Sequence, residues 1–136
     1  MEAIKDWRSL IIAEPLVGLD SDCNENLSLP NVKAKDADEG ASRLSVRWLI
    51  TKEMGAENFA MRLFEMEPGG YSPFHSHPWE HEVFIVEGEG VVVGGGKERK
   101  FRAGDVIFIP PNEKHQLKNS GEKTVKFLCL IPYTQK

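Results

Sequence analysis

The chain of 136 residues has few residues that could cross-link a fold and no segment that could span a membrane. Its two cysteines are Cys23, in a polar stretch, and Cys129, in the apolar run 127–131. A chain of this length buries enough apolar surface to fold as one domain without disulfides. A disulfide is an open alternative, and a free buried thiol is the expectation for Cys129. No apolar run approaches the roughly 20 residues of a membrane-spanning helix.

An excess of one charge and a secretory leader are lacking as well. Lys and Arg number 17 against 21 Asp and Glu, for a formal net charge of −4, and the two signs are interspersed. A basic surface that binds nucleic acid is therefore not expected. Residues 1–8 are charged and lack the apolar core and cleavage site of a secretory signal. We expect a cytoplasmic protein with neither a nucleic-acid nor a membrane partner.

Sustained helical periodicity is absent, and after Gly40 short β-like runs alternate with turn signals. Pro68-Gly69-Gly70, Gly88-Glu89-Gly90 and Gly94-Gly95-Gly96 supply backbone angles that tight turns need. No helical pattern follows the glycine clusters, which argues against a phosphate-binding loop. The predicted strands are residues 43–51, 58–67, 71–77, 81–87, 90–93, 99–101, 106–109, 115–118 and 124–131.

Many short strands rich in Val, Ile and Phe predict an all-β fold, either a sandwich or a closed antiparallel barrel. We expect residues 41–136 to form this β-barrel domain. Residues 1–40 are expected to form an N-terminal arm with one or two short strands, or to be partly mobile. Its apolar pieces, residues 10–12 and 27–29, are candidates to cover the barrel or to pair with a partner chain.

All four histidines lie where a metal site is feasible. Residues two or four apart in an extended segment share a face, so His75, His77 and His81 are expected to point to one side. His115 lies in a separate β-like run. One histidine inside a barrel is about as often a hydrogen-bonded core residue as a ligand. It is the set of four that favours a metal.

The glycine and histidine spacings follow two motifs. The first, over residues 69–77, is a glycine, five residues and His-x-His. The second, over residues 104–119, is a glycine, five residues, Pro-x-x, two residues, a histidine, three residues and an asparagine. In both motifs and in their order the chain resembles the cupins, a superfamily of small β-barrels. The resemblance covers about residues 43–131 and implies a double-stranded β-helix, or jelly-roll barrel, and a homodimer.

The chain departs from the cupin motifs at two positions. Asn112 stands where the second motif has glycine, and asparagine is the non-glycine residue that best adopts a left-handed conformation, so the turn should persist. Where the first motif has a glutamate, His81 stands at the three-residue spacing and Glu82 at the four-residue spacing. His81 keeps the parity of the preceding histidines and the spacing to Gly88. His81 should therefore face the metal and Glu82 should not.

The chain thereby resembles a subgroup of small cupins that hold their metal with four histidines. The resemblance implies one divalent transition metal, Mn, Fe, Co, Ni, Cu or Zn, bound by His75, His77, His81 and His115. Because no carboxylate is contributed, the metal would keep its double positive charge and favour an anionic ligand. Six-coordination would leave two positions open for a small molecule.

Other residues near the motifs have two readings each. Arg62 is a candidate to orient an anionic substrate, but strand alternation leaves open whether Arg62 or its neighbours Met61 and Leu63 point inward. Glu80 and Glu82 either accept hydrogen bonds from imidazole N–H groups or are solvated.

We predict foremost a small oxidoreductase of the dioxygenase type acting on a small molecule. The alternatives are a non-catalytic metal- or ligand-binding module and a metal-assisted isomerase or lyase.

Overall fold

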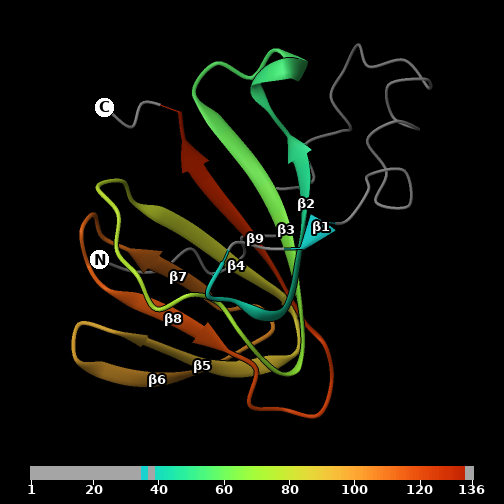
Figure 1. Ribbon diagram of the computed structural model, residues 1–136, viewed down its shortest axis with the longest axis vertical. Coiled ribbons are helices and arrows are strands. Elements are labelled where there is room, and N and C mark those ends of the chain that lie inside the picture. The colour runs from blue at the N-terminus through green and yellow to red at the C-terminus, as the bar shows by residue number, and fades with distance from the viewer. Residues whose placement is uncertain (1–34, 37–38, 134–136) are drawn as a thin grey trace. The chain divides into compact units, whose positions relative to one another are not determined.

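The computed structural model describes residues 35–36 and 39–133, which all belong to the compact unit formed by residues 33–136 (Figure 1). Predictions about Cys23 and residues 10–12 and 27–29 lie outside the described residues, and the domain boundary at residue 40 stays a prediction. The elements are β1 (Lys35–Asp36), β2 (Ser42–Ile50), the 3-10 turn η2 (Lys52–Met54), β3 (Phe59–Tyr71), β4 (His81–Glu87), β5 (Glu89–Gly94), β6 (Lys97–Arg102), β7 (Val106–Ile109), β8 (His115–Lys118) and β9 (Val125–Pro132).

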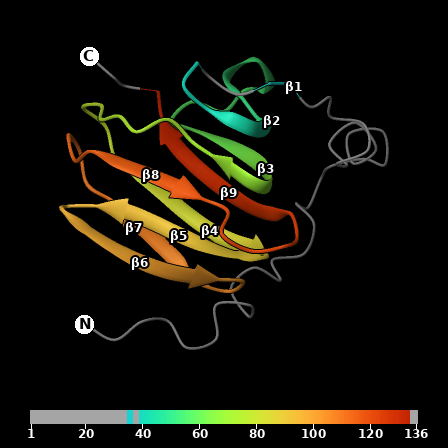
Figure 2. The same ribbon diagram turned by 60° about the horizontal axis from the view of Figure 1, so that its bottom comes forward.

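The strands form one curled antiparallel sheet, seen in Figures 1 and 2. Its order is β6-β5-β8-β3-β9-β4-β7, and β2 pairs with β3 and carries β1. β3 joins the two parts of the sheet, because its first eight residues pair with β9 and its last, Tyr71, pairs with Lys118 of β8. The all-β class and jelly-roll arrangement predicted from the sequence are confirmed. No helix in the described part is long and apolar enough to cross a membrane.

Apolar residues of alternating parity fill the inside of this curl. In β4, His81, Val83 and Ile85 are buried while Glu82 and Val86 are exposed, as strand geometry requires when one face packs. The buried residues that form the core cluster are Leu44, Met66, Val83, Ile85, Phe101, Ile109, Leu117, Val125, Phe127 and Cys129. The histidine at the start of β4 therefore shares the inward face of the core residues.

The segment that precedes the histidines differs from its prediction. A strand over residues 71–77 is wrong: β3 runs on through the expected turn, and Gly69 bends it with φ +83° instead of reversing the chain. Residues 72–80 form no ladder apart from one antiparallel bridge between His75 and His115. The two prolines in this segment have no N–H to donate to a neighbouring strand. The histidines thus lie on a loop, which frees them from strict alternation.

The predicted left-handed turn at Asn112 is confirmed. Asn112 has φ +68°, a conformation that asparagine tolerates better than other residues with a side chain. Its backbone N–H donates to the carbonyl oxygen of His77 at 2.7 Å. This hydrogen bond ties the turn before β8 to the loop that carries the first histidines, so the two motifs meet in space.

Candidate metal centre

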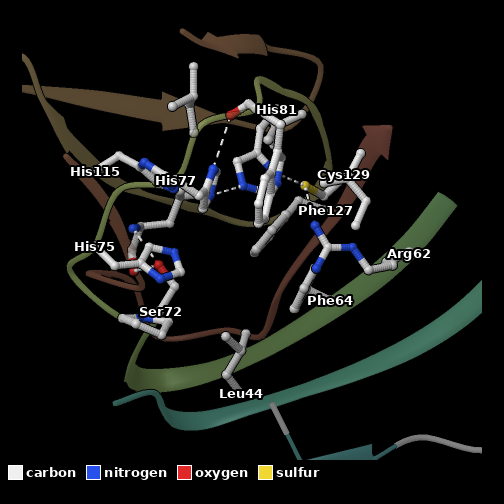
Figure 3. Close-up of a pocket in the computed structure, with 16 residues that line it drawn as sticks. Leu44, Arg62, Phe64, Ser72, His75, His77, His81, His115, Phe127 and Cys129 are labelled. Atoms are coloured by element: carbon white, nitrogen blue, oxygen red, sulfur yellow. Dashed lines mark hydrogen bonds between the residues drawn. The ribbon is translucent and has the colours of Figure 1, made fainter. Parts of the chain in front are cut away.

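A cavity of about 120 Å³ adjoins the core, and all four histidines line it (Figure 3). His75 and His77 come from the loop before β4, His81 is the first residue of β4, and His115 is the first residue of β8. The backbones of His75 and His115 exchange hydrogen bonds of 3.2 and 3.0 Å. Residues 40 positions apart are thereby held side by side at one end of the cavity.

The imidazole rings of His75, His77 and His115 converge. Their ring centroids are 5.0 to 5.1 Å apart, and one ring nitrogen of each lies within 4.8 Å of the other two. Nδ1 of His77 lies 3.0 Å from the carbonyl oxygen of Trp79, and Nδ1 of His115 lies 2.9 Å from that of Glu113. A carbonyl only accepts, so each Nδ1 carries the proton and each Nε2 is left with a lone pair. This neutral nitrogen set fits a divalent transition metal.

His81 stands beside this group. Its ring centroid is 4.3 Å from that of His77 and 5.2 Å from that of His115, and its Nε2 is 2.5 Å from Nε2 of His77. The set of nitrogens within 4.8 Å of one another comprises the other three histidines of the described chain. His81 is 8% exposed and Glu82 is exposed, which is the orientation the sequence predicts. The assignment of His81 as a fourth ligand stays a prediction.

Burial favours the neutral form of His81 and His77. It lowers the pKa of His81 to about 2, and the electrostatic influence of the neighbouring His77 and Arg62 acts in the same direction. Burial also lowers the pKa of His77, although the hydrogen bond to Trp79 opposes the change. A metal binds the deprotonated imidazole, so these environments favour the form that a metal needs.

The question of which face of β3 points inward is answered by Arg62 and Phe64, which both line the cavity. Arg62 is 9% exposed, and its Nη2 donates to Sγ of Cys129 at 3.0 Å. Sγ of Cys129 is also 2.9 Å from Nδ1 of His81. The expected free buried thiol is confirmed, and burial raises its pKa while Arg62 opposes that rise. A neutral thiol therefore stands between a cation and an imidazole.

The sequence did not indicate the role of Cys129 as a contact between Arg62 and His81. Phe127, Cys129 and Ile131 alternate along β9 and all line the cavity, so the parity of the predicted strand contains the signal. Glu80 and Glu82 are exposed, which agrees with solvated carboxylates. Leu117 lines the cavity with the parity of His115. The walls around the histidines are thus mainly apolar.

A small all-β barrel in which three histidines could hold a metal ion defines the class of the protein, and similarity to known proteins identifies its family. The chain matches the Cupin domain over residues 62–131 and belongs to the cupin family. It is 34% identical over 96 residues to the oxalate-binding protein of Thermotoga maritima, which is 68% of this chain and 78% of that protein.

Two further relatives are named for polyketides. The structure of the polyketide cyclase RemF from Streptomyces resistomycificus aligns with a TM-score of 0.73 and 35% identity over 77% of this chain and 76% of that one. The polyketide synthase CurC of Streptomyces cyaneus is 32% identical over 85 residues, 61% of this chain and 55% of CurC. The chain spans about half the length of two other relatives, 46% of one and 50% of the other.

Proposed function

We propose that His75, His77, His81 and His115 hold one divalent transition metal, and that this centre binds a small molecule through oxygen donors. The observation that carries the proposal is that four imidazoles line one cavity, three of them with ring nitrogens within 4.8 Å of one another, and that no acidic side chain is among its described lining residues. Four neutral nitrogens suit Mn, Fe, Co, Ni, Cu or Zn, and the set does not select among these metals.

The chain's own groups hold the donor atoms in place. The carbonyls of Trp79 and Glu113 accept from Nδ1 of His77 and His115, which keeps Nε2 free on both rings. The indole of Trp79 stacks on the ring of His77, with centroids 4.5 Å apart and planes 6° from parallel. Stacking restricts rotation of the ligand ring, so the donor geometry is set before any metal arrives.

We propose further that the protein is an enzyme acting on a small carbonyl or carboxylate compound. A metal at this site would supply Lewis-acid polarisation of a bound oxygen. The apolar walls formed by Leu44, Phe127 and Ile131 exclude water around the polarised group, which strengthens electrostatic interactions there. Similarity to an oxalate-binding protein and to a polyketide cyclase supports ligands with several oxygen donors.

The size of the cavity favours a short ligand. Sites for drug-sized ligands enclose roughly 300–1,000 Å³, whereas this cavity encloses about 120 Å³. A compound with a handful of non-hydrogen atoms fits inside, and a multi-ring compound would enter with one end only. The first experiments should therefore use small oxo acids and dicarboxylates before larger polyketides.

A dioxygenase is the second candidate, and the donor set favours it. Four neutral ligands would leave the metal its full charge, and a six-coordinate metal would have two positions open for a substrate beside dioxygen. A metal-assisted isomerase or lyase would turn over without oxygen, and a binding module would not turn over at all. Measuring oxygen uptake with an oxygen electrode distinguishes the dioxygenase from the isomerase or lyase. Mass balance on the substrate distinguishes both enzymes from the binding module.

Elemental analysis of protein purified without a metal-affinity tag tests the centre directly. We expect about one transition metal per chain after anaerobic reconstitution with Fe(II), Mn(II), Ni(II), Cu(II) or Zn(II). A wild-type protein that retains none of these metals would contradict the proposal. The homodimer and the cytoplasmic location stay predictions, which light scattering of the purified protein and fractionation of the source cells would test.

A further inference from the structure

Arg62 is a buried cation, and the described part of the chain contains no buried carboxylate to pair with it. It is 9% exposed, it lines the cavity, and its Nε is buried without a hydrogen-bond partner. Among the described residues its hydrogen-bond partner is the thiol of Cys129. Burying a charge is costly unless that charge is paired and hydrogen-bonded. The position is therefore one that an anion would stabilise.

Aromatic rings pack against the guanidinium of Arg62 and leave its Nε unpartnered. Cζ lies 4.8 Å from the ring centroid of Phe64 and 5.3 Å from that of Trp48, so aromatic faces hold the guanidinium through cation–π contacts. Trp79 lines the same cavity, and its Nε1 is also buried without a partner. Both unpartnered groups are donors, so a ligand that pairs with either of them must accept a hydrogen bond.

The histidines and Arg62 are close enough for one short ligand. Sγ of Cys129 is 3.0 Å from Nη2 of Arg62 and 2.9 Å from Nδ1 of His81, so a single thiol separates the cation from a candidate ligand ring (Figure 3). A guanidinium binds a carboxylate in a planar, bidentate manner that no imidazole offers. The cavity therefore contains an anion-binding group next to a candidate metal centre.

We propose that Arg62 is the anion-binding residue of the cavity, and that its ligand is a small carboxylate with a second oxygen donor, either a dicarboxylate or a 2-oxo acid. The second oxygen donor of this ligand reaches the metal centre, and this contact with the metal rests on the function proposed above. The contact between the carboxylate and Arg62 stands on the cation itself and holds with or without a metal.

The test compares anion binding by wild type, Arg62→Met and Arg62→Lys with oxalate as the probe. Oxamide, the uncharged analogue of the same shape, is the ligand control. Arg47→Met is the protein control, because Arg47 lies on the adjacent strand β2, pairs with Glu65 at 3.0 Å and does not line the cavity. Calorimetric titrations are run on metal-free and metal-loaded protein, and metal content and urea unfolding are measured for every variant.

We expect wild type and Arg47→Met to bind oxalate but not oxamide. Arg62→Met should bind oxalate at least about tenfold more weakly while retaining its metal, since a charged hydrogen bond is lost. Arg62→Lys, which keeps the charge without the fork, should recover part of the loss. Lower stability of Arg62→Met with unchanged oxalate affinity would mean that Arg62 is only structural and would overturn the proposal.

Two other outcomes also decide the question. A wild type that binds oxalate in neither state, or binds oxamide equally well, overturns the anion site. A wild type that takes up no metal contradicts the proposed function alone. In that case the comparison of metal-free wild type with Arg62→Met decides whether Arg62 binds the carboxylate.

Discussion

The neighbours His81 and Glu82 provide the sharpest test of the candidate centre. His81→Gln and Glu82→Gln each place the same neutral amide in β4, one on the buried face and one on the exposed face. If His81 is a ligand, its loss should weaken metal binding by about 100-fold. This is the upper end of the loss seen when a residue that only hydrogen-bonds to a metal ligand is mutated. Glu82→Gln should leave affinity unchanged, because its side chain points to solvent.

The affinity change converts into a shift of melting temperature. Free metal at about 1,000 times the wild-type Kd stabilises the folded protein by about 4.1 kcal/mol. After a 100-fold loss the same metal concentration stabilises His81→Gln by only about 1.4 kcal/mol, a difference of about 2.7 kcal/mol. For a domain of this size that difference corresponds to roughly 10 °C in Tm.

The measurement is a pair of thermal scans, with and without metal, for wild type and both variants. Only the metal-induced shift in Tm is compared, because a glutamine at a buried position also changes the stability of the metal-free fold. We expect a shift in Glu82→Gln within about 1 °C of wild type and a much smaller shift in His81→Gln. Equal shifts in all three proteins would remove His81 from the ligand set and leave a centre of three histidines.

Three further predictions are tested by urea unfolding of metal-free protein, and the third also by the metal content of reconstituted protein. The pKa of His81 is about 2 in the folded protein and 6.5 in the unfolded chain. Below pH 6.5 the unfolded chain therefore binds a proton that the folded protein does not bind. Wild type should therefore lose about 2 kcal/mol relative to His81→Gln between pH 7 and pH 5; parallel pH profiles would refute this. Gly88→Ala should destabilise the fold by about 1–3 kcal/mol more than Gly96→Ala. Both glycines have positive φ, but a Cβ at Gly88 would lie 2.7 Å from the Thr124 carbonyl oxygen, whereas one at Gly96 would meet nothing within 4 Å. Equal losses of stability would argue against that close approach. Asn119→Ala should cost about 2–4 kcal/mol, because its buried amide donates to two backbone carbonyls at 2.8 Å. Metal content per folded Asn119→Ala molecule should stay at the wild-type value, and a loss would indicate a direct role at the centre.

Short β-like runs separated by turn signals carried most of the fold prediction. The runs 81–87, 106–109 and 115–118 were predicted with the bounds that β4, β7 and β8 have. Strand parity correctly predicted that His81 points inward and Glu82 outward. The strand prediction failed at residues 71–77, because a glycine pair that often ends a strand here only bends one. Gly70 lets the neighbouring strand pass so closely that a Cβ would meet the carbonyl oxygen of Arg43 at 2.8 Å.

The sequence by itself determined the all-β class, the family resemblance and the four histidines, because these depend on spacing and local backbone preference. Only the tertiary structure decided that Arg62 points inward and that Cys129 touches both Arg62 and His81. Alternation distinguishes two faces of a strand without saying which one meets the core. That choice follows from packing β3 against β9, which are about 65 residues apart in the chain, and pairing across such a distance leaves no local signal.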